Sequence, residues 1–361
     1  MKFDSLCVHG AKKDADGLGS VAVPIYQTAT FSRSAVGQGS GYDYSRLQNP
    51  TREQLELRIA ALDGGSDAMA FSSGMAAAQL LLELFSPGDH IVISDDLYGG
   101  THRLFGAVSK KNGLEFSEIG AAEELTAALR PNTKAVIVET PTNPMMKIFD
   151  IAAIASVTKP RGILLVVDNT FLTPYFQRPL ELGADVVLYS GTKYLAGHND
   201  TLAGFLVTGT QELSDKLRYL FKTVGSCLAP FDSFLVLRGL KTLHLRLARQ
   251  DESAKKAAAF LGTHPSVAKV LYPGVGGMIS FYVKNEETAR RTLERLKLIL
   301  FAESLGGTES LITYPMTQTH ADVAPEARAK LGINAELLRL SVGVEDADDI
   351  IADLDAALSL R

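Results

Sequence analysis

A chain of 361 residues with 46% hydrophobic and 21% charged residues is long enough for two domains and has the composition of a globular protein. Its net charge of −5, with both signs interspersed, offers no basic surface for nucleic acid, and its apolar runs are too short to span a membrane. The N-terminus lacks an apolar signal core, and Cys7 and Cys227 form no CxxC pair. We therefore expect a cytoplasmic protein without a disulfide framework, a metal site, or a nucleic-acid or membrane partner.

Residues 1–48 are punctuated by Gly, Pro and Ser and show no clear hydrophobic period, which predicts an arm. Because such an arm cannot fold alone, a second subunit is a natural surface for it to pack on. After Asn49 the pattern predicts a helix that runs to Leu62 and ends at Gly64 and Gly65.

A short strand, a small-residue turn and an Ala/Leu-rich helix are predicted over residues 68–78. Small residues let the backbone approach a ligand, and the free N–H groups of a helix start favour a phosphate. A plain helix cap is the alternative, since many Ser-Gly turns bind nothing.

Strands and helices then alternate along the chain. Strands are predicted at 90–93, 114–116, 134–139, 163–168, 185–189 and 205–207, with helices at 101–111, 122–129 and 150–158. The strands are continuously apolar, which predicts a mostly parallel sheet covered by helices on both faces.

Polar groups follow several of these strands where ligands of such sheets bind, beyond the carboxyl ends. Asp168, Ser190 and Lys193 fall there, as do residues 140–144 after the strand that ends at Glu139. A lysine in this place is usually a solvated charge. Together with a carboxylate, however, it suits a Schiff-base lysine and the partner of a pyridinium ring, the arrangement that pyridoxal phosphate needs.

After Pro230 the pattern changes to a long helix and shorter strands. Helices are predicted at 233–261, 286–296, 326–331 and 346–358, and strands at 268–272, 278–283, 297–301 and 337–341. We therefore expect three parts: an arm (1–48), a large α/β domain (49–230) and a smaller α+β domain (231–361).

The chain resembles the Cys/Met-metabolism family of pyridoxal-phosphate enzymes, which includes cystathionine γ-synthases, γ-lyases and β-lyases and methionine γ-lyases. The resemblance covers nearly the whole chain. The matching motifs are YSRLQNPT (44–51), FSSGMAA (71–77), LYGGTHRLF (97–105), ETPTNP (139–144), VVDNTF (166–171), SGTKYLAGHND (190–200), AESLGGTESL (302–311) and LLRLSVG (337–343). It implies the fold type I, transferase-like architecture of pyridoxal-phosphate enzymes, and a homotetramer built from dimers with shared active sites.

The resemblance also implies roles at the cofactor. Lys193 would hold pyridoxal 5′-phosphate as an internal aldimine and later move protons as the free amine, and Asp168 would keep the pyridine nitrogen protonated. The groups expected to bind the phosphate are Ser73, Gly74, Met75, Ser190 and Thr192, together with Tyr44 and Arg46 reaching in from a neighbouring subunit. A monomer would then have an incomplete site.

Further residues match substrate positions of the family. Tyr98 would stack on the cofactor and act as acid or base at the leaving group, although a packing role is the alternative. Arg339 would pair with the substrate α-carboxylate, and Asn143 and Ser304 would hold that carboxylate or the cofactor ring. We expect His198 and its neighbours to shape a loop.

Members of this family remove the Cα proton to form a quinonoid and then diverge. At position 303 the chain carries a glutamate, as γ-synthases and γ-lyases do. Glu303 would hold the distal ammonium of cystathionine, and Arg103 would bind the distal carboxylate. Gly99 and Gly100 fill the place where methionine γ-lyases usually carry a cysteine. Cystathionine cleavage by γ- or β-elimination therefore ranks first, synthesis of cystathionine from cysteine and an activated homoserine second, and methionine cleavage below both.

The chain departs from the family between Gly274 and Gly277, where a longer segment is usual. This short join is either a true deletion or an omitted disordered segment.

Two rival classes of protein fit the sequence less well. A nicotinamide-dependent oxidoreductase would need a GxGxxG motif after its first strand, which the chain lacks, and a binding scaffold would not need both Lys193 and Asp168.

Overall fold

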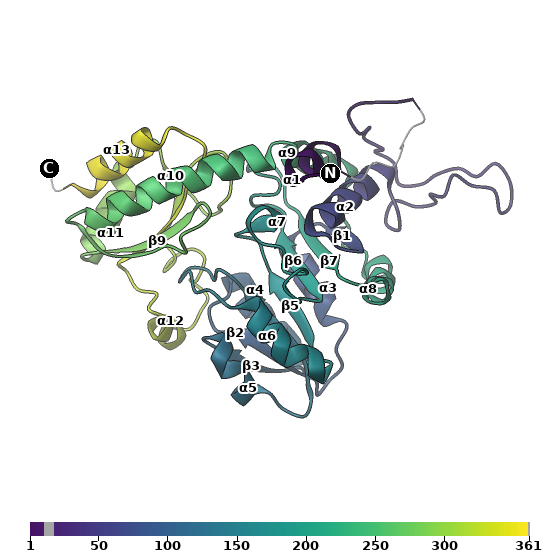
Figure 1. The fold of residues 1–361 in the computed structure, drawn as a ribbon, viewed down its shortest axis with the longest axis horizontal. Helices are drawn as coiled ribbons and strands as arrows, with labels where there is room; N and C mark the ends of the chain where they lie inside the picture. Colours follow the sequence, from purple (N-terminus) through teal and green to yellow (C-terminus); the bar gives the residue numbers. More distant parts are fainter. Residues whose placement is uncertain (11–17, 360–361) are drawn as a thin grey trace.

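The computed structural model describes residues 1–10 and 18–359; residues 11–17 of the predicted arm and 360–361 of the predicted C-terminal domain lie outside it. Figure 1 shows a larger body around a seven-stranded sheet and a smaller body around a five-stranded sheet. Residues 18–48 extend away from the larger body. Within the described residues, no helix is both long and apolar enough to cross a membrane.

The larger sheet has the strand order β1-β7-β6-β5-β4-β2-β3. Strands β2 to β6 run parallel to one another, and β7 runs antiparallel to both β1 and β6, so the predicted mostly parallel sheet is confirmed. The strands are β1 (Asp67–Phe71), β2 (His90–Ser94), β3 (Glu115–Ile119), β4 (Thr133–Glu139), β5 (Leu164–Asp168), β6 (Val186–Ser190) and β7 (Gly204–Thr208).

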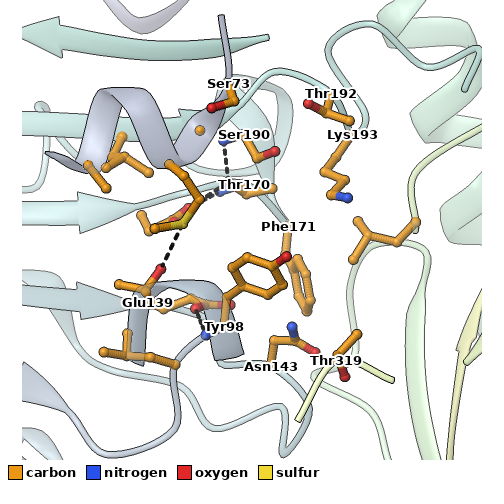
Figure 2. Close-up of a pocket in the computed structure, with 18 of the residues that line it drawn as sticks. Ser73, Tyr98, Glu139, Asn143, Thr170, Phe171, Ser190, Thr192, Lys193 and Thr319 are labelled. Atoms are coloured by element: carbon orange, nitrogen blue, oxygen red, sulfur yellow. Dashed lines mark hydrogen bonds between the residues drawn. The ribbon is translucent and has the colours of Figure 1, made fainter. Parts of the chain in front are cut away.

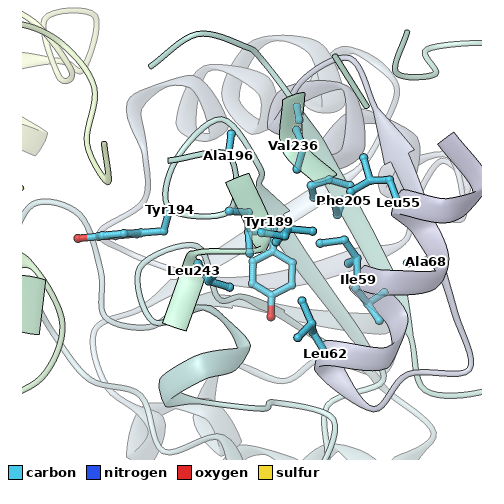
Figure 3. Packing of buried hydrophobic residues seen from close by; sticks show 14 of the residues in the cluster. Leu55, Ile59, Leu62, Ala68, Tyr189, Tyr194, Ala196, Phe205, Val236 and Leu243 are labelled. Carbon is cyan, nitrogen blue, oxygen red and sulfur yellow. The ribbon is translucent and has the colours of Figure 1, made fainter. Parts of the chain in front are cut away.

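Helices cover both faces of this sheet because successive strand residues point to opposite sides. In β6, Leu188 packs among residues of α3 (Gly74–Leu82) and α8 (Gln211–Val224), whereas Tyr189 packs with Leu55, Ile59 and Leu62 of α2 (Pro50–Asp63). Figure 3 shows this second cluster, with Tyr189 between α2 and Leu243. The other helical segments of the large body are α1 (Phe3–His9), α4 (Gly99–Arg103), the π-helical η1 (Leu104–Ser109), the 3₁₀-helical η2 (Ala122–Glu124), α5 (Leu125–Ala128), α6 (Ile151–Thr158), the 3₁₀-helical η3 (Lys159–Arg161), α7 (Thr173–Phe176) and α9 (Pro230–Leu240).

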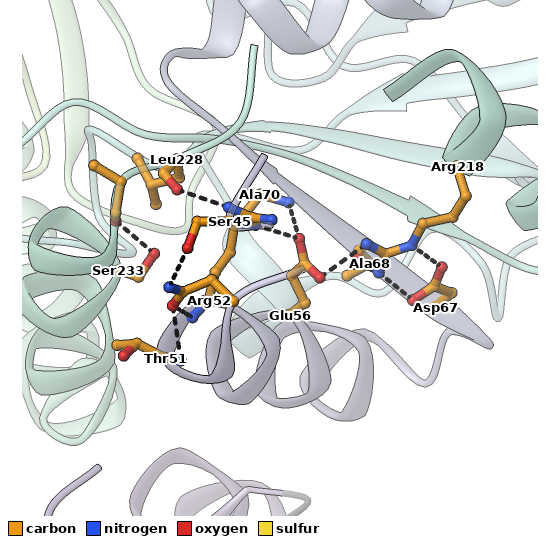
Figure 4. A network of polar contacts seen from close by, with 12 residues as sticks. Ser45, Thr51, Arg52, Glu56, Asp67, Ala68, Ala70, Arg218, Leu228 and Ser233 are labelled. Carbon is orange, nitrogen blue, oxygen red and sulfur yellow. Dashed lines mark hydrogen bonds and ion pairs between the residues drawn. The ribbon is translucent and has the colours of Figure 1, made fainter. Parts of the chain in front are cut away.

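A network of charged side chains ties α2, β1 and α8 together (Figure 4). Arg218 of α8 donates to both carboxylate oxygens of Asp67 at 2.7 Å and to Glu56 of α2 at 2.9 Å. Glu56 also accepts from the backbone N–H of Ala70 at 3.0 Å. Because each carboxylate is satisfied by several donors, the network fixes the helix that follows the arm against the sheet.

The smaller body has a five-stranded sheet in the order β10-β11-β12-β9-β8, in which only β10 and β11 pair in parallel. Its elements are α10 (Leu243–Thr263), β8 (Val267–Leu271), β9 (Met278–Val283), α11 (Glu286–Arg295), β10 (Leu300–Phe301), β11 (Leu311–Thr313), α12 (Pro325–Leu331), β12 (Leu337–Ser341) and α13 (Ala347–Leu358). Helix α10 belongs to two hydrophobic clusters: Leu243 and Leu247 pack in the large body, and Ala257 and Leu261 pack in the small one. The short join at residues 272–277 forms a loop between the antiparallel strands β8 and β9.

Several predicted segments differ in the structure. The predicted strand 297–301 is reduced to β10, and the predicted helix 101–111 divides into α4 and the π-helical η1. A single helix over 233–261 is wrong, because the chain leaves helical geometry at Thr242 and forms α9 and α10. The buried Arg246 donates to the backbone oxygen of Gly239 at 3.0 Å, which satisfies a carbonyl at the end of α9. Residues 3–9 of the predicted arm form helix α1, whose Cys7 is fully buried and whose C-terminal end is bound by Arg58.

Candidate active site

A cavity lies where the carboxyl ends of β4, β5 and β6 face the small body. It brings together most of the residues that the sequence singled out (Figure 2). Those that line it are Ser73, Gly74, Met75, Tyr98, Asn143, Asp168, Ser190, Thr192, Lys193, Glu303, Ser304 and Arg339. The two bodies therefore both contribute walls to one site.

Lys193 reaches into the cavity from the turn that follows β6 (Figure 2). Its Nζ donates to the Ser304 hydroxyl at 3.2 Å. Burial, followed by the nearby charge of Arg339, lowers the pKa of Lys193 from 10.5 to about 8. A larger fraction of neutral amine is present near physiological pH than for a surface lysine, and the neutral amine is the form that attacks a carbonyl carbon.

Asp168 ends β5 and presents its carboxylate to the same cavity. Its Oδ1 accepts from the backbone N–H of Thr170 at 3.0 Å and from the Thr170 hydroxyl at 2.6 Å. Burial raises the pKa of Asp168 to about 6, while the two Thr170 hydrogen bonds act in the opposite direction. Among the described residues, no ion pair involves this carboxylate. A protonated pyridine nitrogen would supply the missing cation, so the position fits the expected cofactor.

The part of the cavity lined by Ser73, Gly74, Ser190 and Thr192 has the features of a phosphate site. Ser73 caps α3 by accepting from the N–H of Ala76 at 3.1 Å, and the first N–H groups of a helix have no partner within it. A Cβ on Gly74 would lie 3.0 Å from the Cα and Cβ of Ser190, so the helix start can approach β6 this closely only without a side chain. Thr192 places a second hydroxyl nearby, held by the backbone of Ala203.

Arg339 of β12 forms the cationic part of the wall from the small body. It is 2% exposed, and its guanidinium donates to Asn143 Oδ1 at 2.8 Å, to the Ser304 backbone oxygen at 3.0 Å and to Thr313 Oγ1 at 3.0 Å. Burial lowers its pKa to about 10. Every one of these partners is neutral, and no carboxylate of the described residues pairs with Arg339. A buried guanidinium held in this way is suited to a substrate carboxylate.

Tyr98 stands at the start of α4, with its ring facing Lys193 across the cavity (Figure 2). The two glycines that follow are needed for this placement. A Cβ on Gly100 would lie 2.5 Å from the Tyr98 ring, and a Cβ on Gly99 would lie 2.1 Å from the backbone oxygen of Thr319. Gly99 therefore lets α4 contact the small body directly.

Glu139 is a cavity residue to which the sequence analysis gave no role. It ends β4, is 6% exposed, and accepts from the backbone N–H of Tyr98 at 3.1 Å. Burial, and then the neighbouring charge of Asp168, raise its pKa well above 4.5. Its place at a strand end beside Asp168 was the available signal. Thr170 and Thr319 also line the cavity without having been singled out.

Three predicted site residues lie outside the cavity of their own chain. Arg103 forms an exposed ion pair with Asp322 at 2.5 Å. Tyr44 is 45% exposed, and Arg46 lies over its ring at 5.7 Å while donating to the backbone oxygen of Lys222. His198, expected to shape its loop, contacts the backbone oxygen of Ala196 within that loop at 2.8 Å.

A second, wider cavity opens beside the first and shares Thr192, Leu202, Glu303 and Ser304 with it. Its remaining walls come from residues 72, 199–201, 227–229, 232, 300, 302, 309 and 311. The first cavity can therefore be approached from this side.

Comparison with known proteins gives a consistent result. A family model described as "Cys/Met metabolism PLP-dependent enzyme" matches residues 4–359. The chain is 48% identical over 355 positions to a cystathionine gamma-synthase of Haemophilus influenzae, covering 98% of this chain and 96% of the relative. It is 45% identical over 372 positions to a cystathionine beta-lyase of Lactococcus lactis, covering 98% of both. Among solved structures, a cystathionine gamma-lyase from Lactobacillus plantarum complexed with L-serine superposes with a TM-score of 0.95 at 44% identity, covering 99% of this chain and 98% of that chain.

Proposed function

Because the chain belongs to the Cys/Met-metabolism family of pyridoxal-phosphate-dependent enzymes, we propose that it is a carbon–sulfur lyase that cleaves cystathionine by γ- or β-elimination. The observation that carries the proposal is the convergence of three groups in one cavity. They are an amine with a pKa near 8, a carboxylate without a cationic partner, and a buried guanidinium without an anionic one.

The proposed cofactor arrangement uses the groups described above. Lys193 would hold the aldehyde end, Asp168 the ring nitrogen, and the start of α3 with Ser190 and Thr192 the phosphate. Bound pyridoxal phosphate supplies an electron sink that acidifies the carbon bearing the substrate amine.

The protein's own groups would then act on the substrate. Arg339 binds the α-carboxylate and fixes which Cα bond is presented to the cofactor. Nζ of Lys193 removes the Cα proton, which its lowered pKa suits, and its hydrogen bond to Ser304 orients it. The Tyr98 hydroxyl protonates the departing sulfur. In γ-elimination, a second proton must leave Cβ before the γ-substituent departs.

Specificity is assigned to Glu303, which lies on the cavity wall and faces the wider second cavity as well. Its carboxylate would pair with the distal ammonium of cystathionine. The position of Arg103, outside the cavity and paired with Asp322, does not support its expected contact with the distal carboxylate unless that ion pair opens. Synthesis of cystathionine from cysteine and an activated homoserine is the second candidate, and the 48% identity to a gamma-synthase favours it.

The test is to supply cystathionine, cysteine, methionine, and O-acylhomoserine with cysteine in separate reactions. Release of 2-oxobutyrate from cystathionine identifies γ-elimination, and release of pyruvate identifies β-elimination. Cystathionine formed in the last reaction, with no cleavage in the first, would replace the lyase by the synthase. No product in any of the four reactions would refute both.

We further propose a homo-oligomer, a tetramer built from dimers, in which Tyr44 and Arg46 reach the phosphate end of a neighbouring site. Support comes from segment 18–48, which extends away from the large body (Figure 1) and in which Leu18, Val21 and Val36 are more than 80% exposed. Further support comes from the open second cavity, which shares Thr192 with the first.

Mixing inactive variants tests this sharing. Arg46→Ala and Lys193→Ala chains should each be inactive alone, and after joint refolding about a quarter of wild-type activity should return, since half of random dimers contain one intact site. Mixtures that stay as inactive as the separate variants would show that each site is built from one chain.

A further inference from the structure

Three carboxyl groups stand side by side at the carboxyl edge of the large sheet. Glu139 ends β4, Asp168 ends β5, and Asp96 follows β2, on three strands that are neighbours in the sheet. Glu139 and Asp168 are directly paired in the β4–β5 register. Side chains at paired positions of neighbouring strands lie on the same face of the sheet, so these two carboxyl groups are neighbours in the same environment.

Their hydrogen-bond partners differ. The backbone N–H of Ser190 donates to the Thr170 hydroxyl oxygen at 2.9 Å, so the Thr170 proton is left to donate to Asp168. Asp168 thus receives two hydrogen bonds at one oxygen, from the hydroxyl and from the backbone N–H of Thr170. Glu139 receives one, from the backbone N–H of Tyr98. The donors therefore favour the negative charge on Asp168 over the negative charge on Glu139.

We propose that Glu139 is a positioning residue, which holds the Tyr98 backbone at the cavity wall as a neutral acid and thereby leaves the negative charge of the pair on Asp168. This inference rests on the proposed cofactor site, in which Asp168 must be anionic to face a pyridinium.

The groups that face Glu139 support a neutral state. Asp168 of β5 and Asp96 beyond β2 both raise the pKa of Glu139, whereas Arg339 of β12 and the Tyr98 N–H lower it. Arg339 makes no ion pair with Glu139, because its two terminal nitrogens donate to Asn143, Ser304 and Thr313 instead. Two adjacent buried carboxyls cannot both ionise cheaply, so one keeps its proton.

A neutral Glu139 affects how the free energy of unfolding depends on pH, and this can be measured without any enzymatic reaction. With its pKa raised above 4.5, folded Glu139 keeps a proton that the unfolded chain releases, so its ionisation removes stability as the pH rises above that value. Glu139→Gln cannot ionise. The cofactor-free Glu139→Gln protein should therefore lose less stability than wild type between pH 5 and pH 8 in urea unfolding. Asp95→Asn is the matched control, because Asp95 at the same sheet edge is ion-paired with Lys147 and should not reproduce this change.

Binding of pyridoxal phosphate to the cofactor-free protein, followed by fluorescence, tests the positioning role. Glutamine keeps an oxygen that accepts from the Tyr98 N–H, so Glu139→Gln should bind within about threefold of wild type, and Glu139→Ala should bind about tenfold more weakly. If Glu139→Gln binds as weakly as Glu139→Ala, or if its unfolding profile runs parallel to that of wild type, Glu139 is an anion and the proposal is overturned. Because neither measurement depends on a reaction, inactivity on all four substrate mixtures would refute the proposed function without deciding this point.

Discussion

The two walls of the cavity are built in different ways. The sheet-edge wall consists of Glu139, Asp168, Ser190 and Lys193, which end or follow adjacent parallel strands. The C-terminal wall consists of Glu303, Ser304 and Arg339, which come from a loop and from β12 of the small body. Strand register fixes the spacing of the first wall, whereas the packing of the two bodies fixes the position of the second. The first wall therefore suits chemistry shared across a family, and the second suits selection among substrates.

The largest effect is expected on the sheet-edge wall. Lys193→Ala should keep the fold, because the side chain ends in a cavity. It should lower turnover at least about a thousandfold, because Lys193 is the only lysine among the described residues that line this cavity. Product formation by the variant, with its fold checked by circular dichroism, measures this. Turnover near the wild-type level would contradict the assignment of the chemical step to the sheet-edge wall.

On the C-terminal wall, replacement of Arg339 should affect substrate binding more than turnover. Arg339→Lys keeps the charge but loses the planar pair of donors, so KM should rise about tenfold or more while kcat changes less. Steady-state kinetics with cystathionine give both constants. A loss confined to kcat would place Arg339 with the reacting groups instead.

The smallest effect is expected for Glu303, which faces both cavities. Glu303→Gln should lower kcat/KM about tenfold for cystathionine, through loss of a charge pair with the distal ammonium, and should leave substrates without that ammonium nearly unchanged. The ratio of the two kcat/KM values is the measurement. Equal losses on both substrates would assign Glu303 to the structure of the wall.

The sheet-edge wall was largely predictable from the sequence. Apolar runs that end in Asp168 and Ser190 predict buried parallel strands, and such strands bring their carboxyl ends together, so Lys193 and Asp168 were expected at one edge before any geometry was known. The family resemblance extended this to Arg339 and Ser304, which lie far away in the sequence.

Other features depend on three-dimensional packing and carry little local signal. The state of Glu139 follows from its burial beside Asp168, which only the strand register reveals. At the break at Thr242, Arg246 of α10 donates to the carbonyl of Gly239 in α9, a contact between two helices that the sequence pattern does not reveal. The surface ion pair between Arg103 and Asp322 joins residues of the two bodies. Because they lie far apart in the sequence, the motif around Arg103 does not predict this contact.

Helix α10 limits how the site can open. Its first turns pack in the hydrophobic cluster of the large body, and its last turns pack in the hydrophobic cluster of the small body. One continuous helix therefore connects the two bodies and holds them in a fixed relative position. A hinge that swung the two bodies apart would have to expose Leu247 or Leu261 to water or bend a continuous helix, and both cost free energy. We therefore expect substrate to enter and product to leave through local movement of side chains and loops at the cavity entrance. The two bodies remain a single unit during each catalytic cycle.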